Sequence, residues 1–339
     1  MGSPKVHILV VGGGSIGKRH VRNLLTLGAD VTVYRYRKGI IDELQAWSNQ
    51  LRFAVSLEEA LTGICDAVVI ANSTELHIKV ALAAARLCKH LFIEKPLSTS
   101  LKGVDELVHL VEENRLIVET GFMLRLHPNL KHLKARLDAG AIGIPSYARA
   151  AVGQYLPDWR PGTDYRQSYS ASRRQGGGVI LDLVHELDLI AWLLGDVDVV
   201  AAMVARSSLL EIETEAIAQI GLRMNSGVLA QVHLDYLRPG YTRSLEIVGS
   251  EGIFSWDYLT GTLNFAGRDG IFHLVHQVTT GFERNDMFLA HMRHFLAQLS
   301  EGAPQPVSSL ADGIRALRIA LACHLSSQER RFVRPYEVE

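Results

Sequence analysis

The stretch KVHILVVGGGSIGKRHVRNLLTLG, residues 5–28, decides the fold of this 339-residue chain. It opens with an aliphatic run at 6–11, which predicts a strand buried on both faces, and continues into a helical pattern. Gly12, Gly14 and Gly17 lie between the two in the spacing G-x-G-x-x-G. In this context the first glycine permits a tight turn, the second admits a pyrophosphate, and the third lets the helix pack closely on the strand. A glycine-rich turn without a ligand is the alternative interpretation.

The turn predicts a dinucleotide site, with Ser15 and Ile16 at the positive end of the helix dipole. An NAD site usually adds an acidic residue about 20 positions later. Here the strand-like run 31–34 is followed by Arg35 and Arg37. Since a guanidinium binds a 2′-phosphate that a carboxylate repels, we expect NADP(H) to be preferred, with NAD(H) possible. The alternative is a solvated basic loop in which Arg35 only stacks on adenine.

Strand-like and helix-like segments alternate through the first third of the chain. This alternation predicts right-handed βαβ units and a doubly wound parallel sheet in an N-terminal domain, residues 1–124. The strand-like runs are 5–12, 31–34, 66–71, 90–94 and 116–120, and the helix-like segments are 15–28, 75–88 and 100–114.

The remainder, residues 125–339, predicts a second α/β domain with a large open sheet. Residues 227–237 alternate an apolar with a mixed face, as in a mixed or antiparallel sheet that is packed on one side. Two helices are expected at about 282–300 and 308–327.

Composition excludes several classes of protein. A net charge of −1 argues against nucleic-acid binding, and no apolar run reaches the roughly 20 residues that span a bilayer. We expect a cytoplasmic protein in which Cys65, Cys88 and Cys323 are buried and reduced. His291 and His294 are three apart, but without matching carboxylates they predict a core or surface pair rather than a metal site.

Polar residues follow two of the expected strands. Asn72, Ser73 and His77 come after one, and Glu94 and Lys95 come after the next. Because ligands bind at the carboxyl ends of strands in doubly wound sheets, we expect these residues beside the cofactor, with Lys95 near the nicotinamide. A surface lysine that ends a strand is the alternative for Lys95.

The segment QGGGVILDLVHELDLI, residues 175–190, places Asp182, His185, Glu186 and Asp188 in an apolar setting. It predicts one continuous helix with an apolar stripe. Asp182 and His185, three apart, would be neighbours on its polar face. Large residues interrupt that face, so we do not expect it to be simply solvated.

With these motifs the chain resembles, over nearly its whole length, the glucose–fructose oxidoreductase / myo-inositol dehydrogenase (Gfo/Idh/MocA) family of NAD(P)-dependent oxidoreductases. The segments that carry the resemblance are the glycine turn, ANSTELH (71–77), EKP (94–96), GFMLRLHPNLKHLKARLDAGAIG (121–143), GGGVILDLVHELDL (176–189), LEIVGSEG (245–252) and LADGIRALRIALACHLSS (310–327). The resemblance implies a Rossmann domain, an open-sheet domain that commonly forms the subunit interface of a homodimer or homotetramer, and hydride transfer to or from a sugar ring carbon.

The resemblance also assigns roles. Lys95 matches the lysine of the EKP motif, His185 the acid/base histidine, and Asp182 the aspartate that precedes it. Asn72 and Ser73 depart from the usual Thr-Pro beside the cofactor. Asp182 and His185 are three residues apart where the family more often has four, so the duty of Asp182 stays open: it orients His185 or binds a sugar hydroxyl.

The aromatic and basic loop at 154–175 supplies further candidates. We expect Tyr155, Trp159 and Arg166, together with Arg125, to contact the substrate. The loop is either a lid for an acidic or nucleotide-linked sugar or a solvated loop pinned to the sheet by its aromatic residues.

The sequence therefore predicts an NADP(H)-preferring sugar or ketosugar oxidoreductase. His185 would exchange the proton and Lys95 would stabilise the reacting oxygen. The alternatives are a non-catalytic NAD(P)-binding regulatory protein on the same fold and an enzyme with a non-sugar substrate.

Overall fold

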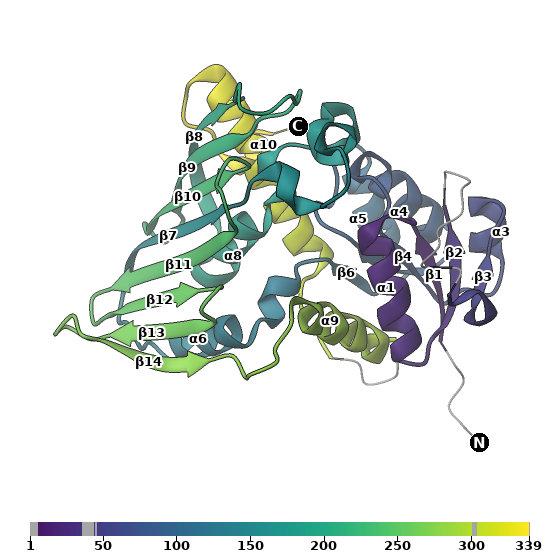
Figure 1. Ribbon diagram of the computed structural model, residues 1–339, viewed down its shortest axis with the longest axis horizontal. Helices are drawn as coiled ribbons and strands as arrows, with labels where there is room; N and C mark the ends of the chain where they lie inside the picture. Colours follow the sequence, from purple (N-terminus) through teal and green to yellow (C-terminus); the bar gives the residue numbers. More distant parts are fainter. Residues whose placement is uncertain (1–5, 36–43, 45, 300–303, 339) are drawn as a thin grey trace. The chain divides into compact units, whose positions relative to one another are not determined.

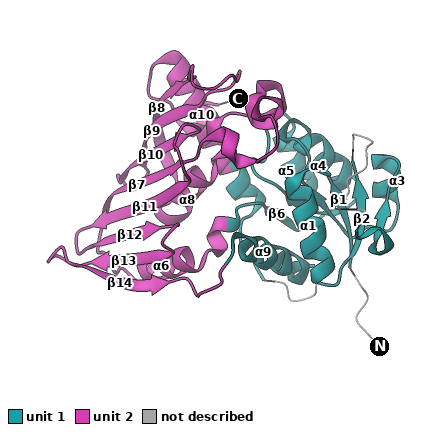
Figure 2. Ribbon diagram, in the orientation of Figure 1, with its two compact units in different colours: residues 1–123, 283–314 teal, residues 124–282, 315–339 magenta. Residues whose placement is uncertain are grey.

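The computed structural model describes residues 6–35, 44, 46–299 and 304–338. The chain forms two compact units, shown in different colours in Figure 2: residues 1–123 with 283–314, and residues 124–282 with 315–339. The first boundary falls one residue before the expected one. Residues 283–314, which the division into 1–124 and 125–339 placed in the second domain, belong to the first unit. The reason is packing, because Met292 and Phe295 lie in the core of that unit.

The first unit contains a six-stranded sheet in the order β3-β2-β1-β4-β5-β6, with every pair parallel (Figure 1). This is the doubly wound order, with its topological switch point between β1 and β4. The strands are β1 His7–Val11, β2 Asp30–Tyr34, β3 Leu51–Phe53, β4 Ala67–Ile70, β5 His90–Ile93 and β6 Val118–Thr120. The expected parallel sheet is confirmed. Strand β3 was not predicted, because Arg52 and Phe53 are exposed and the strand contains no apolar run that would indicate a buried strand.

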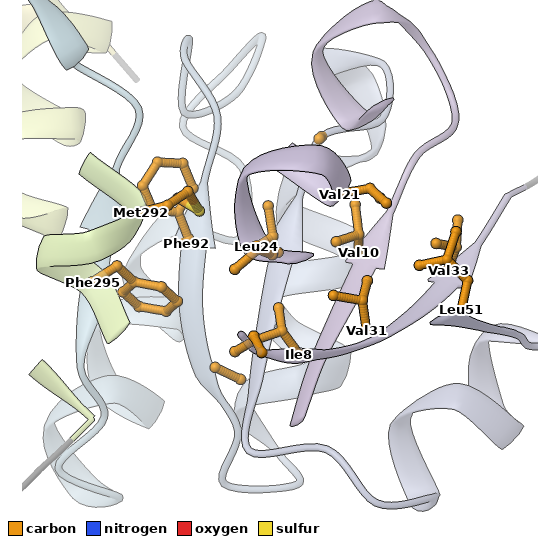
Figure 3. Close-up of a cluster of buried hydrophobic side chains, with 14 of the residues drawn as sticks. Ile8, Val10, Val21, Leu24, Val31, Val33, Leu51, Phe92, Met292 and Phe295 are labelled. Atoms are coloured by element: carbon orange, nitrogen blue, oxygen red, sulfur yellow. The ribbon is translucent and has the colours of Figure 1, made fainter. Parts of the chain in front are cut away.

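Five helices of the described chain accompany this sheet: α1 Ser15–Thr26, α3 Leu57–Thr62, α4 His77–Ala85, α5 Val104–Glu113 and α9 Arg284–Gln298. Helix α1 buries Val21 and Leu24 against Val10 and Val31 of the sheet, and Phe295 of α9 joins the same cluster (Figure 3). Fully buried aliphatic side chains such as these contribute about 1.5–3 kcal/mol each. The packed core therefore fixes the ends of β1 and α1, and with them the glycine turn that joins these two elements.

The second unit is built on an eight-stranded sheet in the order β14-β13-β12-β11-β7-β10-β9-β8. Only the pairing of β7 with β10 is parallel, so the sheet is mixed, as expected. The strands are β7 Pro145–Gly153, β8 Val197–Ala205, β9 Ile217–Met224, β10 Leu229–Asp235, β11 Thr242–Gly249, β12 Ile253–Asp257, β13 Thr262–Ala266 and β14 Phe272–Gln277.

Helices cover one face of this sheet (Figure 1): α6 Pro128–Asp138, α7 Val179–Asp182 and α8 His185–Leu194. The second half of α10 Leu310–Glu329 lies at the β8 edge, where Ser326 and Ser327 accept from the backbone N–H groups of Ala202 and Val204. The apolar positions expected to face the core in and around β10 are all buried: Val228, Ala230, Val232, Leu234 and Tyr236. On the opposite face, Leu229 and Tyr147 are exposed, and a groove there is lined by residues of β7 to β10 and by Phe332.

Two smaller expectations meet the structure differently. Cys65 and Cys323 are buried free thiols as expected, but Cys88 is exposed, because it follows α4 at a surface turn with a positive φ. The prediction of three buried cysteines was therefore wrong at one position. Within the described ranges, no helix is long and apolar enough to cross a membrane.

Candidate active site

The three glycines of the turn between β1 and α1 each meet a different spatial demand. Gly12 has a φ of +127°, and a Cβ on it would collide with the backbone of Ala71 at the end of β4. A Cβ on Gly17 would collide with the carbonyl of Gly12, so this glycine lets α1 approach the turn. A Cβ on Gly14 would meet nothing within 4 Å. Gly14 therefore leaves open space at the start of α1, where a pyrophosphate would need it.

The start of α1 fits a bound anion electrostatically as well. Gly14 is the N-cap of α1, so Ser15 and Ile16 are its first helical residues, and the first turn has no acidic side chain. The first backbone N–H groups of a helix have no partner within that helix, and the dipole adds a positive field. Gly14, Ser15 and Ile16 thus lie at the N-terminus of α1, and their contact with a phosphate stays a prediction.

The segments that follow β4 and β5 are joined by His77. Its Nδ1 lies 2.9 Å from the carbonyl oxygen of Pro96, and its Nε2 lies 3.2 Å from that of Asn72. Burial lowers the pKa of His77 and so favours the neutral imidazole, whose single N–H donates to one of these two carbonyls at a time. His77 thus lies between the loop carrying Asn72 and Ser73 and the loop carrying Lys95, whose peptide bond to Pro96 is cis.

Asn72 points to a polar ligand at this edge of the sheet. Both its amide nitrogen and its amide oxygen are buried, and neither has a hydrogen-bond partner among the described residues. Leaving a buried amide unpaired costs about 1–3 kcal/mol per group. With the space at Gly14, this observation fits the binding of a dinucleotide to the first unit.

Lys95 is connected to α1 through the carboxylate of Glu94, a buried contact that the sequence did not predict. The Nε2 of His20, on α1, lies 2.7 Å from Glu94 Oε1, and the backbone N–H of Lys95 donates to Glu94 Oε2 at 3.2 Å. Burial acts to raise the pKa of Glu94, but the hydrogen bond and charge of His20 and the charge of Lys95 outweigh it and hold that pKa low. Glu94 is thus an anion beside Lys95, and its contact with the cofactor stays a prediction.

The basic residues after β2 are only partly described. Arg35 directly follows Tyr34, and its guanidinium lies over the ring of Phe53 at 6.0 Å from the centroid. Arg37, the second residue expected to bind a 2′-phosphate, lies outside the described residues. In the observed strand, no carboxylate occupies the end of β2 where the 2′-hydroxyl of NAD is usually held.

His291 lies in the core of the first unit, and His294 is partly exposed. His291 Nε2 lies 3.2 Å from Glu119 Oε2, and His294 Nε2 lies 2.8 Å from the carbonyl oxygen of Gln305. The backbone N–H groups of Val307 and Ser308 also bind the Glu119 carboxylate. Among the residues that the structure describes, no group of three or more His, Cys, Asp or Glu side chains is arranged to hold a metal.

In the second unit, the segment 179–194 is not the continuous helix that we expected. Helix α7 ends at Asp182, Leu183 leaves helical geometry with φ −102° and ψ 26°, and α8 begins at His185. Asp182 and His185 are therefore on two helices separated by a break, and the expectation that they share one helical face was wrong. Both side chains are buried, at 3% and 4% exposure, as are Glu186 and Asp188, so the polar side is not solvated.

Two of the four ionisable groups in this segment are neutralised by arginines. Arg125 binds Asp188 through two hydrogen bonds, of 3.1 Å from Nε and 2.6 Å from a terminal nitrogen. Arg243 lies 2.7 Å from Glu186, and both partners are almost fully buried. Paired in this way, these charges hold the helix in place.

Asp182 lies beside two tyrosines. Tyr236, at the end of β10, donates its hydroxyl to Asp182 Oδ2 at 2.5 Å, and the phenol of Tyr169 lies near the same carboxylate. Burial, and then the negative charge of Asp182, raise the pKa of both tyrosines. Both phenols therefore stay protonated, and that of Tyr236 acts as a donor to this carboxylate.

Glu215 lies close to the same cluster. Its side chain is 12% exposed, its Oε1 accepts from the backbone N–H of Ile180 at 3.4 Å, and it lies 3.8 Å from His324 Nε2. Burial, with a further contribution from the charge of Asp182, raises the pKa of Glu215 to about 7. Burial and the charge of Arg173 lower the pKa of His324 to about 4. The contact between Glu215 and His324 is thus not an ion pair near neutral pH.

The loop at 154–175 is anchored by several contacts. Trp159 donates its indole N–H to the carbonyl of Gln154 at 3.1 Å and packs edge-on against Tyr236, with centroids 5.2 Å apart. Arg166 pairs with Asp164 and Glu211 at the surface. Tyr155 is half-buried and directly precedes the short helix Leu156–Trp159.

These positions bear unequally on the expected substrate contacts. Arg125 and Arg166 each have carboxylate partners within the unit, and Trp159 packs on Tyr236. A substrate role for Arg125, Tyr155, Trp159 and Arg166 stays a prediction.

Four residues around the expected site were absent from the sequence analysis: His20, Tyr236 as a partner of Asp182, Glu215 and His324. The spacing of His20 behind the glycines was the only local signal for any of them. The others come from β10, the segment before β9 and helix α10, so only the fold brings them to Asp182.

Comparisons with known proteins agree on both units. Residues 6–122 match the family model described as "Oxidoreductase family, NAD-binding Rossmann fold", and residues 130–255 match "GFO/IDH/MocA C-terminal domain". The myo-inositol 2-dehydrogenase of Thermotoga maritima is 28% identical over 98% of this chain and 99% of its own. The inositol 2-dehydrogenase of Acidothermus cellulolyticus is 31% identical over 73% of this chain and 71% of its own. A structure of levoglucosan dehydrogenase in complex with NADH shares the fold, with a TM-score of 0.87 at 19% identity over 98% of this chain and 99% of that one.

Proposed function

The chain belongs to the GFO/IDH/MocA family of oxidoreductases, whose first domain is an NAD-binding Rossmann fold, and from this premise we propose that it is a dehydrogenase of sugar-like substrates. The reaction is hydride transfer between the nicotinamide and a ring carbon of a sugar, ketosugar, inositol-like polyol or sugar derivative. The observation that carries the proposal is the pair of buried groups Asp182 and His185, which are 3% and 4% exposed and stand at the end of α7 and the start of α8.

His185 accepts the proton of the substrate hydroxyl in oxidation and returns it in reduction. An imidazole suits this exchange because it titrates near neutral pH with little tuning, and general acid–base catalysis contributes about 10²–10⁴-fold. Lys95 hydrogen-bonds the reacting oxygen and stabilises the charge that develops there. Glu94, anionic next to Lys95, holds the lysine's backbone in place. The bound nicotinamide supplies the hydride donor or acceptor.

The proposed cofactor is NADP(H) in preference to NAD(H). Support comes from the end of β2, where Arg35 follows Tyr34 and neither residue is a carboxylate that would repel a 2′-phosphate. The levoglucosan dehydrogenase structure contains NADH, so the two cofactors need a direct comparison. Dissociation constants for NADPH and NADH, measured by fluorescence, make that comparison. Tighter binding of NADH would overturn the preference.

The proposed assembly is a homodimer or homotetramer formed through the open face of the eight-stranded sheet. Leu229 is 58% exposed and Phe332 72% exposed beside the groove on that face. An apolar patch of this kind is typical of a surface that another protein covers. Sedimentation velocity of wild type and of Leu229→Glu tests it: we expect an oligomer and a shift toward monomer. A monomeric wild type would contradict the assembly.

The function itself is tested by a substrate screen that follows absorbance of the reduced cofactor with sugars, inositols and nucleotide sugars. His185→Ala is then compared with His273→Ala, an exposed residue of β14. We expect kcat to fall by roughly 10²–10⁴-fold in His185→Ala with dinucleotide affinity unchanged, and both to be preserved in His273→Ala. Wild-type turnover in His185→Ala would remove this histidine from the mechanism.

A further inference from the structure

The Asp182 carboxylate lies beside two phenols that come from different parts of the chain. Tyr236 lies at the end of β10 and is fully buried, and its hydroxyl donates to Oδ2 at 2.5 Å. Tyr169 belongs to the loop at 154–175, and its phenol lies close enough to Asp182 for the charge of that carboxylate to raise its pKa. Hydrogen bonds to a charged acceptor are short and roughly twice as strong as neutral ones. The bond from Tyr236 therefore fixes Oδ2 and occupies part of the capacity of the carboxylate as an acceptor.

The loop is connected to this carboxylate at a second point. The indole of Trp159 packs at 90° against the ring of Tyr236, with centroids 5.2 Å apart. The same loop is tied to the segment before β9, because Thr214 donates to the carbonyl of Ser170 at 2.8 Å and Glu213 donates its N–H to that of Ala171 at 3.2 Å. The loop therefore reaches the surroundings of Asp182 through Tyr169 and supports this carboxylate indirectly through Tyr236.

We propose that Tyr169 and Tyr236 are positioning residues that hold Asp182 as a fixed anion for His185, so that this carboxylate does not bind substrate hydroxyls itself. The proposal rests on the proposed function. It decides between the two duties that the sequence left open for Asp182. It also makes the aromatic loop part of the support of the catalytic centre rather than a separate cover.

Chain geometry places the Asp182 carboxylate near His185. Three residues span at most about 10 Å between Cα atoms, so the anion lies near the residue that carries the imidazole. A carboxylate that is held in one orientation acts on that imidazole with a constant field, whereas one that rotates freely or tilts away does not.

The first test uses Tyr236→Phe and Tyr169→Phe, which remove one hydroxyl each and keep the ring. We expect kcat to fall roughly ten- to hundredfold while KM for the substrate and the dinucleotide dissociation constant stay within about threefold. Tyr258→Phe is the matched control in the same unit, since no hydrogen bond from its hydroxyl to Asp182 is observed, and we expect it to keep the wild-type kcat. If KM rises instead of kcat falling, the hydroxyl contacts the substrate and the proposal is overturned. Unchanged kcat in both variants also overturns it.

The second test uses a small carboxylate as a probe. In Asp182→Ala the two phenols would face a cavity that formate fits, so formate should restore part of kcat and sodium chloride of equal ionic strength should not. Adding Tyr236→Phe to Asp182→Ala should abolish this rescue. Rescue of equal size in both proteins would contradict the proposal.

Formate binding can also be measured without turnover. It should raise the unfolding temperature of Asp182→Ala but not that of the double variant Asp182→Ala/Tyr236→Phe. An inactive wild type would refute the proposed function alone, while this thermal measurement would still decide whether the phenols hold a carboxylate.

Discussion

Glu215→Gln should change how the stability of the protein depends on pH. A glutamate carboxyl ordinarily titrates near 4.5, and burial raises the pKa of Glu215 to about 7. Since each pKa unit corresponds to about 1.4 kcal/mol, this difference is worth about 3 kcal/mol. The side chain is only 12% exposed, so solvent screens this value little.

The sign follows from which state binds the proton. Between pH 4.5 and 7 the folded protein keeps Glu215 protonated, whereas the unfolded chain has lost the proton. The folded state therefore binds more protons, and the free energy of unfolding falls as pH rises through this window. Relative to acid pH, wild type has lost about 3 kcal/mol from this group by about pH 8. The amide introduced by Glu215→Gln has no proton equilibrium but keeps an oxygen that accepts from the N–H of Ile180.

Urea unfolding of wild type and Glu215→Gln at about pH 5, 6, 7 and 8 measures the effect. The free energy of unfolding of the variant minus that of wild type should grow by about 2–3 kcal/mol from the lowest pH to the highest. Other titrating groups cancel in this difference. Glu213→Gln is the control, because Glu213 is an exposed residue two positions from Glu215 and its substitution removes the same carboxylate charge. The reasoning would be refuted if the difference in free energy of unfolding between variant and wild type did not change from about pH 5 to about pH 8. It would also be refuted if Glu215→Gln were less stable than wild type at about pH 8.

Two further predictions concern the glycine turn and a buried ion pair. Gly14→Ala should keep the unfolding temperature of wild type, because its Cβ meets nothing within 4 Å, but it should weaken dinucleotide binding measured by calorimetry. Gly17→Ala should weaken this binding and also lower the unfolding temperature, since its Cβ collides with the carbonyl of Gly12. Equal unfolding temperatures for the two variants would contradict this difference. Arg125→Ala should cost about 3–5 kcal/mol in urea unfolding because it leaves Asp188 buried and unpaired, and Arg125→Met with Asp188→Leu should recover most of that loss. A single variant as stable as wild type would show that Asp188 does not depend on this arginine.

The sequence predicts the first unit well because its signals are local. The strands of four or five residues in the parallel sheet are each marked by a run of apolar residues. The glycines of the turn directly follow the first of these strands and directly precede a helix. Residues 283–314 could not be assigned to the first unit from local signals of this kind. Whether Phe295 packs on this core or on another depends on tertiary contacts that periodicity does not carry.

The surroundings of Asp182 were unpredictable for a related reason. Tyr236 was correctly placed on the buried face of its strand, but the pattern of alternation does not say which polar group a buried hydroxyl meets. Its partner lies 54 residues away in the sequence. A buried tyrosine requires some hydrogen-bond partner, so the general need was visible and its identity was not.

The three-residue spacing between Asp182 and His185 takes on a different meaning once the break at Leu183 is known. On one continuous helix, a change from four residues to three would rotate the carboxylate by about a third of a turn relative to the histidine. Here α7 ends at Asp182 and α8 begins at His185, so the angle between the two side chains is set by how each helix is anchored. Arg125 and Arg243 anchor α8 through Asp188 and Glu186, and Tyr236 anchors the end of α7. The spacing in sequence therefore constrains the geometry of this pair less than the long-range contacts that hold the two helices.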